Sequence, residues 1–512
     1  MKSSRVTSMP KTGVSSWSRR LVLARGAQVL SVLALPAFVV RNAWGQTAAF
    51  DFYISPTGSD SNPGTLASPW ALTSCAPSNA NNSKMAGKRT GFLPGTYVVN
   101  TNTLPGPVSG GVGDYANNLM AIPGGTSGAQ TYWGTSDASG NYSAQTATFT
   151  TSGVNLSPVC GLIGENSQGG GKGYWTVDGF IIDGGGMTGG GHFVQGYYSG
   201  GIYNGSTPGA GPGIIIQNCE MRNMLNGQGG NNDGFVFFEG ASGVIVQNNY
   251  FHTLQKPAQA EPHMHCIEEY GCYGNQYLYN TFMNISNGAT AVESKTGGAA
   301  TTVAYNYFYN IEPGSYGVIM GFDGAEGSPN SPSTPYSIHH NIFDSSAQTK
   351  SVDVNNSDAQ GINWYNNTIY NSPSAQFAAT GASAPVQHYN NIWATSTGST
   401  SLNFTAGSLT VCDYNCYATA SAAGASGFDT HSIKSNPTFS ATIIPGNGPN
   451  QFQLASGSPC AGAGRAGGVS TGAAVNMGAW DGKVTQIGCS FLSGTSAPPV
   501  PVVPNAPTLS VS

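Results

Sequence analysis

A short motif recurs along the second half of the chain at intervals of 24 to 35 residues. Each copy places an asparagine two residues before a bulky apolar side chain, as in "QNNYFHTL", "LYNTFMNI" and "AYNYFYNI". The asparagines are Asn249, Asn280, Asn306, Asn341, Asn367, Asn391 and Asn415, and their apolar partners are Phe251, Phe282, Phe308, Phe343, Ile369, Trp393 and Tyr417. A unit this short cannot enclose a core by itself, so it has to stack on its neighbours.

The spacing selects one kind of stack. An interval of 24 residues suits one turn of a parallel β-helix with three strands per turn, and longer intervals leave room for a loop at one corner. A β-propeller is the alternative, but its blades take about 40–50 residues. We therefore predict an all-β chain folded as a right-handed parallel β-helix. Asparagine amides should bond from turn to turn, and the aromatic rings should stack.

Composition agrees with an extracellular all-β protein. Charged residues make up only 8 % of the chain, and Gly accounts for 72 of 512 residues. Low charge and high Gly can also indicate disorder. Aromatic residues at 10 % and the regular apolar spacing argue instead for a sizeable core.

The N-terminus has the pattern of an export signal. Arg19 and Arg20 precede an apolar run that is too short to span a bilayer permanently, and small residues follow near position 45. The adjacent arginines resemble a twin-arginine signal, and an ordinary Sec signal is equally compatible. We predict an export signal over 1–45, a β-helix domain over 46–484 and a Pro/Ser-rich tail over 485–512. The mature protein is expected in the periplasm, at the surface or outside a bacterial cell.

Removing that signal makes the chain strongly acidic. The signal contains seven of the 18 Lys and Arg residues and none of the 23 Asp and Glu residues, which leaves 11 basic and 23 acidic residues. A formal charge of −12 argues against a nucleic-acid partner. Nine cysteines fit an oxidising destination, and local bridges between Cys266 and Cys272 or Cys412 and Cys416 are possible. We expect a monomer.

The few charges are concentrated in consecutive turns. The segments "GFVFFEG", "HCIEEYG", "TAVESKT" and "GVIMGFD" occupy the same slot in four turns. We expect an inward row of Val236, Ile267, Val292 and Ile319. Because side chains alternate faces, the outward rows would then be Phe237, Glu268, Glu293 and Met320, followed by Glu239, Tyr270, Lys295 and Phe322.

These rows predict one solvent-facing patch that contains Glu239, Glu268, Glu293 and Lys295. Asp233, Glu269, Asp323 and Glu326 are expected at its edges. His252, His263 and His265 are expected in or beside a long loop of residues 252–264. For His263 and His265, in "HMH", loop histidines bonded to the backbone are a simpler interpretation than metal ligands.

A cation would relieve the repulsion between the neighbouring carboxylates. Calcium takes six to eight oxygen ligands, so we predict Ca²⁺ bound by Asp233, Glu239, Glu268 and Glu293. A nearby positive charge disfavours protonation of a lysine. Lys295 could then remove a proton next to a substrate carboxylate while the cation stabilises the enolate. A surface ion pair of Glu293 and Lys295 is the purely structural alternative.

The chain also resembles the pectate-lyase-like superfamily of right-handed parallel β-helices. The resemblance rests on "FYISPTGSDSNPGTLASPWALTS", on "GFLPGTYVV" and on the closing "VNMGAWDG". Within that superfamily, "ESKT" resembles the lysine strand of calcium-assisted lyases, which implies Lys295 as the base. The chain departs from them where it has Gly288, Thr290 and "VIMGFDG", since those enzymes carry metal carboxylates and an arginine there. Tyr270 or His265 would then supply the acid.

Three functions follow from this arrangement. The first is a secreted lyase that cleaves an acidic, uronate-containing polysaccharide by Ca²⁺-assisted β-elimination. Its substrate would also contact His263, Asp323 and Glu326. The second is an inverting glycoside hydrolase that uses two of the carboxylates about 6.5–9.5 Å apart. The third is a glycan-binding or adhesin-like solenoid without catalysis.

Overall fold

The computed structural model describes most of the chain between residues 49 and 492. The described ranges are 49–100, 104, 117–154, 160–165, 172–188, 191–197, 213–224, 233–255, 264–295, 300–312, 315–322, 335–344, 350–354, 361–371, 376–379, 385–394, 401–404, 409–418 and 428–492. The chain divides into two units, Met1–Phe38 and Val39–Ser512, and every described residue belongs to the second. The predicted export signal lies outside the described residues.

Three parallel sheets form the column of the second unit, and from β2 to β33 each turn of the chain adds one strand to each sheet. Sheet 1 contains β1 (Phe52–Ile54), β2 (Arg89–Phe92), β5 (Thr131–Thr135), β8 (Trp175–Asp178), β11 (Ile215–Gln217), β14 (Ile245–Gln247), β17 (Gln276–Leu278), β20 (Thr302–Ala304), β23 (Tyr336–His339), β26 (Ile362–Tyr365), β29 (Val386–Tyr389) and β32 (Leu409–Asp413). Sheet 2 contains β3 (Gly95–Val99), β6 (Ala147–Thr151), β9 (Ile181–Asp183), β12 (Glu220–Met224), β15 (Tyr250–Gln255), β18 (Thr281–Ser286), β21 (Tyr307–Ile311), β24 (Ile342–Asp344), β27 (Thr368–Tyr370), β30 (Ile392–Ala394), β33 (Cys416–Tyr417) and β34 (Ile433–Lys434). Sheet 3 contains β4 (Asn117–Ala121), β7 (Cys160–Gly164), β10 (His192–Tyr197), β13 (Asp233–Glu239), β16 (Met264–Tyr270), β19 (Thr290–Lys295), β22 (Tyr316–Phe322), β25 (Lys350–Val354), β28 (Gln376–Ala379) and β31 (Ser401–Phe404).

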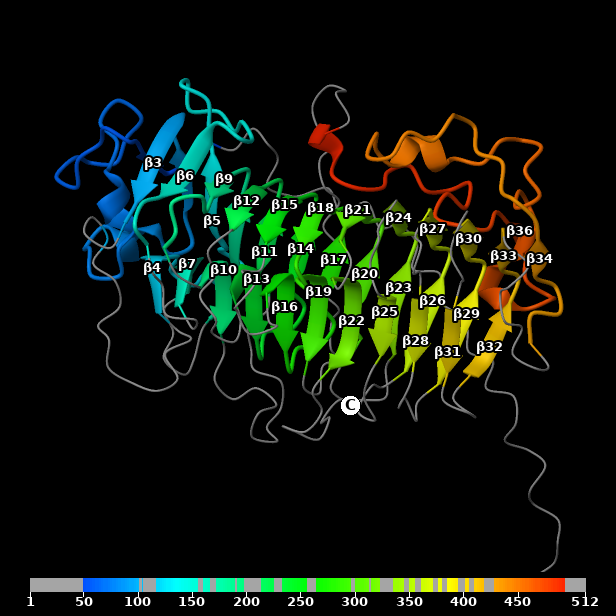
Figure 1. Cartoon of the computed structure of the whole chain (residues 1–512). Helices are drawn as coiled ribbons and strands as arrows, with labels where there is room; N and C mark the ends of the chain where they lie inside the picture. The colour runs from blue at the N-terminus through cyan, green and yellow to red at the C-terminus, as the bar shows by residue number, and fades with distance from the viewer. Residues whose placement is uncertain are drawn as a thin grey trace, which may run out of the picture. The chain divides into compact units, whose positions relative to one another are not determined.

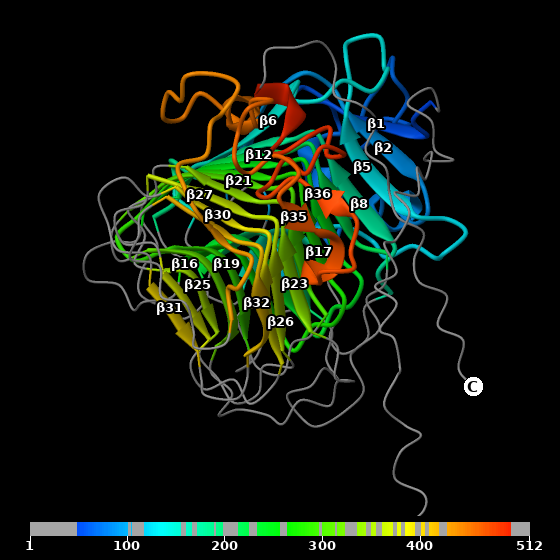
Figure 2. The same cartoon turned by 90° about the vertical axis from the view of Figure 1, so that its right-hand side faces the viewer.

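This order confirms the predicted right-handed parallel β-helix with three strands per turn. Figure 1 shows successive turns side by side along the column, and Figure 2 looks along it, with the three sheets surrounding one interior. The remaining elements are short. They are β35 (Gly464–Arg465), β36 (Ala474–Val475), η1 (Leu72–Cys75), η2 (Asn82–Met85), η5 (Pro449–Phe452), η6 (Ala466–Gly468) and η7 (Ser490–Leu492). Among the described residues, no helix has the length and apolar character needed to cross a membrane.

From β14 to β33, a two-residue corner joins each strand of sheet 1 to the next strand of sheet 2. Its first residue has a left-handed backbone, with φ of +53° at Asn248, +55° at His340 and +52° at Asn366. Asparagine tolerates this conformation better than most residues because its short polar side chain can bond locally. The second corner residue is the repeated asparagine, so the sharp corner and the ladder come from the same dipeptide.

Hydrogen bonds confirm the predicted asparagine ladder. Asn306 Oδ1 accepts bonds from the backbone N–H of Asn280 at 2.8 Å and from Asn280 Nδ2 at 3.2 Å. Its own Nδ2 donates to the carbonyl of Tyr277 at 2.9 Å and to Asn341 Oδ1 at 3.0 Å. The same pattern runs through Asn249, Asn280, Asn306, Asn341, Asn367, Asn391 and Asn415. The ladder therefore ties each corner to the one before and the one after it.

The predicted aromatic stack lies two residues further along. Ring centroids are 5.2 Å apart for Phe251 and Phe282, 4.8 Å for Phe282 and Phe308, and 4.5 Å for Phe308 and Phe343. The planes of the last pair differ by only 7°. All four rings are fully buried in the core. Ladder and stack together fix the register of sheet 2.

The described cysteines are free thiols, so the local bridges that the spacing allowed are not formed. Cys272 Sγ instead donates to the carbonyls of Phe238 and Tyr270 inside the column. Cys412 contacts His388 and Asp429.

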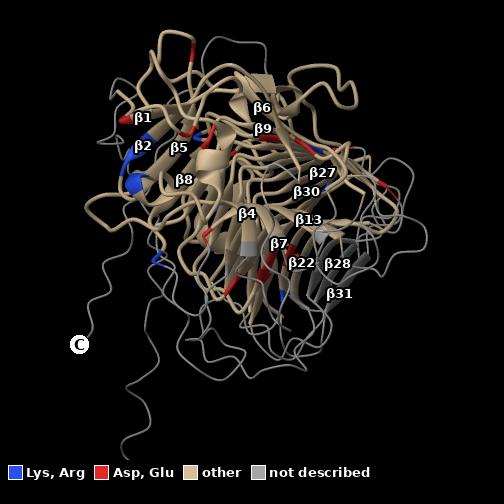
Figure 3. Ribbon diagram, turned by 90° about the vertical axis from the view of Figure 1, so that its left-hand side faces the viewer, with Lys and Arg blue, Asp and Glu red and all other residues tan. Residues whose placement is uncertain are grey.

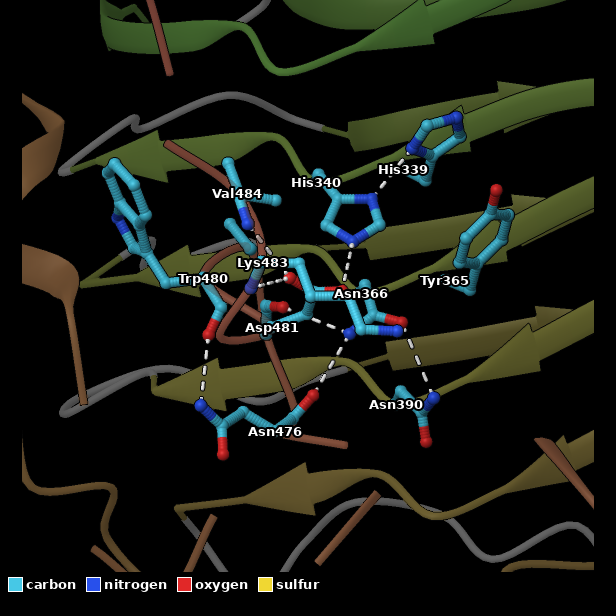
Figure 4. Close-up of polar contacts among 12 residues, drawn as sticks. His339, His340, Tyr365, Asn366, Asn390, Asn476, Trp480, Asp481, Lys483 and Val484 are labelled. Carbon is cyan, nitrogen blue, oxygen red and sulfur yellow. Dashed lines mark hydrogen bonds and ion pairs between the residues drawn. The ribbon is translucent and has the colours of Figure 1, made fainter. Parts of the chain in front are cut away.

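A C-terminal strap, residues 462–492, runs back over the corners from late turns to early ones. Gly478 N–H donates to the carbonyl of Asn390, and Ser490 N–H donates to Asn248 Oδ1 at 2.8 Å. Between them, Asp481 faces His340, with Oδ2 and Nε2 3.6 Å apart, as Figure 4 shows. Gln486 and Ser490 bond to Asn248, and Cys489 bonds to Thr281. The described start of the predicted tail therefore packs on the column.

The ladder should contribute strongly to stability. Asn306→Ala removes bonds to Asn280, Tyr277 and Asn341 and leaves buried polar groups without partners, so we expect the free energy of unfolding to fall by about 2–4 kcal/mol. Urea denaturation of the variant and the wild type measures the difference. Asn363→Ala, in the partly exposed part of β26, is the control and should change stability by less than about 1 kcal/mol. Equal losses in both variants would contradict the proposed role of the ladder.

Candidate active site

The outer face of sheet 3 carries the charged residues that the sequence placed together. Val236, Ile267 and Val292 pair across β13, β16 and β19 and belong to the core. Because side chains alternate along a strand, the next residues point away from that core. Phe237, Glu268 and Glu293 form one outer row, and Glu239, Tyr270 and Lys295 form the next. The predicted rows are confirmed for these three turns.

The prediction fails by one residue in the fourth turn. Val318, not Ile319, pairs with Val292, and Ile319 pairs with Glu293. Val318 and Met320 are fully buried in the core, so Met320 is not part of the outer row. A register irregularity after Ser294 then brings Lys295 level with Phe322. A one-residue slip exchanges the two faces of a strand, and an irregularity of this kind leaves no clear mark in the sequence.

Five side chains converge on this outer face and form what we call the charge cluster. Lys295 Nζ lies 2.8 Å from Glu268 Oε1, 2.9 Å from the hydroxyl of Tyr270 and 3.7 Å from Glu293 Oε1. His265 lies between the two carboxylates. Its Nδ1 is 3.1 Å from Glu268 Oε2, and its Nε2 contacts Glu293 Oε2. The cluster thus joins residues of two adjacent strands, β16 and β19.

The prediction of a solvent-facing patch is wrong for the charged members. His265, Glu268, Glu293 and Lys295 are each only 1–2 % exposed, and Tyr270 is the partly exposed member. Burial of a single charge is costly, but opposite charges in contact offset much of that cost. Removing one partner of such a set leaves an uncompensated buried charge, so the cluster is held together as a unit.

The pKa values follow from these contacts. Burial alone would lower the pKa of His265, but the carboxylates of Glu268 and Glu293 outweigh it and raise the pKa to about 9. Burial alone would raise the pKa values of Glu268 and Glu293, but His265 and Lys295 lower both of them. At neutral pH the two glutamates are therefore ionised and His265 is protonated. Perturbed groups that depend on specific charged partners mark candidate functional sites.

The predictions for His265 and Glu269 are wrong. His265 lies in β16 and contacts Glu268 and Glu293, so it is not a loop histidine bonded to the backbone. His252 lies in β15, where its Nε2 is 3.1 Å from Glu220 Oε1. Glu269 is not at the edge of the patch. It points into the column, is fully buried, and accepts bonds from Tyr277 and Thr301.

The other predicted site residues are only partly visible. Glu239 is level with Tyr270 in the adjacent strand and is partly exposed. Asp233 begins β13 and pairs with Met264, but its side chain is outside the described part of the structure. The three residues predicted to contact substrate, His263, Asp323 and Glu326, all lie outside the described residues.

The described carboxylates do not fit a calcium site as they are arranged. Three of the four carboxylate oxygens contact His265 or Lys295 within 3.1 Å, and the fourth, Glu293 Oε1, is 3.7 Å from Lys295. Among the described residues, no group of three or more His, Cys, Asp or Glu side chains could hold a metal ion. Calcium needs six to eight oxygens that are not taken by such donors.

Sequence reasoning did not extend the outer rows beyond four turns. Gln195 of β10 is level with Phe237 on one side of these turns, and Asp353 of β25 is level with Ile319 on the other side. His192, also on β10, stacks on Phe237 with centroids 4.6 Å apart. The alternation of apolar and polar residues in "KSVDV" is the sequence signal from which the position of Asp353 could have been predicted. Figure 3 shows acidic residues in red on neighbouring strands near the β7 and β22 labels.

Comparison with known proteins does not assign the chain to a family. No protein-family model and no curated protein matches the chain. Similar solved structures include pectate lyase Pel9A, with 18 % identity, a TM-score of 0.45, and coverage of 84 % of this chain and 96 % of that one. A rhamnogalacturonan lyase has 12 % identity, a TM-score of 0.39 and coverage of 79 % and 94 %. The mannuronan C-5 epimerase AlgE4 A-module of Azotobacter vinelandii has 12 % identity, a TM-score of 0.37 and coverage of 71 % and 90 %. Function therefore has to be argued from the side chains.

The cluster predicts a defined pH dependence of stability. A raised pKa in the folded state contributes fully below the unfolded value, about 6.5 for histidine. That contribution is lost as the pH rises through about 9, the value for His265. The stability difference between wild type and His265→Gln should therefore be largest below pH 6.5 and shrink toward pH 9.

Urea denaturation across this pH range measures the effect. His388→Gln is the control because burial lowers the pKa of His388 to about 3. A lowered histidine pKa changes stability below its unfolded value of about 6.5, so this control should stay nearly level from pH 7.5 to 9. A constant difference for His265→Gln over the same range would contradict the proposed charge state.

Proposed function

We propose that this chain is a polysaccharide lyase that cleaves an acidic, uronate-containing polysaccharide by β-elimination. The observation that carries the proposal is the hydrogen bond between Lys295 and Tyr270, which places an amine and a phenol side by side on the outer face of sheet 3. β-Elimination needs these two functions at one point. A base removes the proton next to the sugar carboxylate, and an acid protonates the departing glycosidic oxygen.

The two residues can complete a balanced cycle. Lys295 as the free amine takes the proton from the carbon next to the carboxylate, a carbon–carbon double bond forms, and the bond to the glycosidic oxygen breaks. Tyr270 gives its phenolic proton to that oxygen. The Lys295 ammonium then returns a proton to Tyr270 along their 2.9 Å contact. Both residues end in the state in which they began.

The neighbouring contact positions the amine. Lys295 Nζ donates a hydrogen bond of 2.8 Å to Glu268 Oε1, and Lys295 has to lose one proton to solvent before it acts as the base. His265 is less suited to be the acid because both of its ring nitrogens contact carboxylates. Tyr270 is partly exposed, so substrate would approach from its side of the cluster.

The contacts argue against a hydrolase that uses Glu268 and Glu293. Lys295 Nζ lies 2.8 Å from one Oε1 and 3.7 Å from the other, so those oxygens are at most the sum of these distances, 6.5 Å, apart. Inverting enzymes need about 6.5–9.5 Å between carboxyl groups and one protonated acid. Both pKa values are lowered here, which leaves neither carboxyl protonated at neutral pH.

Export and calcium remain predictions. We propose that the enzyme works outside the cytoplasm, where such polymers occur, and that its export depends on residues 1–45. A calcium requirement would have to be met by carboxylates outside the charge cluster, and Asp233 and Glu239 are the remaining members of the predicted calcium set.

The reaction is tested with alginate, pectate and glycosaminoglycans. We expect ultraviolet absorbance from unsaturated uronide ends to appear with at least one of them, because elimination leaves a double bond conjugated to the carboxylate. New reducing ends without this absorbance would instead indicate hydrolysis. Binding without any product would indicate a glycan-binding solenoid. A parallel reaction with chelator tests the calcium prediction.

Substitutions in the pair test the residue roles. Lys295→Ala and Tyr270→Phe should each lower kcat by about 10²-fold or more, the usual contribution of a general base or acid. Lys434→Ala, at an exposed position of β34, and Tyr309→Phe, at a partly exposed position of β21, are the matched controls and should keep full activity. Circular dichroism of each variant separates loss of chemistry from loss of fold. Full activity in a folded Lys295→Ala variant would disprove the assignment of the base.

A further inference from the structure

His265 occupies the position between two carboxylates that a metal ion would need. Its Nδ1 lies 3.1 Å from Glu268 Oε2, and its Nε2 contacts Glu293 Oε2 from the adjacent strand. Lys295 takes the other side of the same pair, at 2.8 Å from Glu268 and 3.7 Å from Glu293. The protein thus surrounds both carboxylates with its own cations.

The charges of these four side chains balance one another without a metal ion. Two carboxylates carry two negative charges, and an imidazolium with an ammonium carries two positive charges. A divalent cation would supply the same charge, but it would have to remove His265 and Lys295 from oxygens that they already contact. Buried ion pairs are stable only when each charge keeps its partner, so that exchange would disrupt the whole cluster.

In the described strands on either side of β16, the residues level with His265 are uncharged. The residues level with it are Gly234 in β13 and Thr290 in β19. A Cβ at Gly234 would lie 2.2 Å from the backbone oxygen of His265, so the two strands approach closely only because position 234 is glycine. The charged groups that face the imidazole from described residues are Glu268, Glu293 and, across the same pair, Lys295.

We propose that His265 is a positioning residue that takes the place of a divalent cation in this cluster. It holds Glu268 and Glu293 in the orientation in which they fix Lys295 beside Tyr270. The carboxylates of the cluster then position Lys295 and do not bind calcium. This inference concerns ion binding and not turnover, so it can hold or fail independently of the proposed lyase reaction.

Calcium-dependent thermal shifts of the mature protein test the proposal. Unfolding temperatures are measured with and without millimolar CaCl₂ for wild type, Glu268→Gln, Glu293→Gln and His265→Gln. Glu220→Gln, which removes a carboxylate from sheet 2, is the control. Wild type and both glutamate variants should respond to calcium equally. His265→Gln should gain a calcium-dependent rise of roughly 2 °C or more, because the exposed pair of carboxylates then binds the ion.

Each outcome decides the question. A calcium-dependent rise in wild type that is lost in Glu268→Gln or Glu293→Gln but kept in Glu220→Gln would show that the cluster binds the metal, and would overturn the proposal. A folded His265→Gln variant without any calcium response would also overturn it. If His265→Gln does not fold, the comparison of wild type with the two glutamate variants decides by itself.

Discussion

The hydrogen-bonded ladder of asparagine amides is the constraint on which the rest of the structure depends. Each amide binds the corner before it and the corner after it, and the amides lie inside the column, where water cannot replace them. The ladder therefore allows one register between turns. Because the strands of sheet 3 belong to the same turns, that register also decides which side chains meet on its outer face. Glu268, Glu293 and Lys295 come together because the corners are locked elsewhere.

The column buries carboxylates in two different ways, at two adjacent positions. Glu269 points inward and is satisfied by the neutral donors Tyr277, Asn275 and Thr301, and burial raises its pKa. Glu268 points outward and is bound by His265 and Lys295, which lower its pKa. The inner carboxylate is held by hydrogen bonds from uncharged side chains. The outer one stays ionised between His265 and Lys295, and it lies on the face that carries the proposed base.

Much of this could be predicted from the sequence, because the governing interactions repeat. The spacing of Asn249, Asn280 and Asn306 predicts the fold, and simple alternation predicts the outer rows of β13, β16 and β19. Prediction fails where an interaction does not repeat. The irregularity after Ser294 is local, and before it Val318, not Ile319, is level with Val292, so Met320 lies in the core and not in the outer row. The burial of the charges and the position of His265 depend on contacts between side chains, which periodicity does not encode.

The strap at the C-terminal end has a consequence for how the molecule is made. It is synthesised after the turns that it contacts, and it binds corner residues from Asn390 back to Asn248. It can dock only when those corners are already aligned. A ribosome-bound chain therefore presents these corners without the strap until residues 462–492 have been made. Closure of this seam is a built-in check that every turn between its two ends has been stacked correctly.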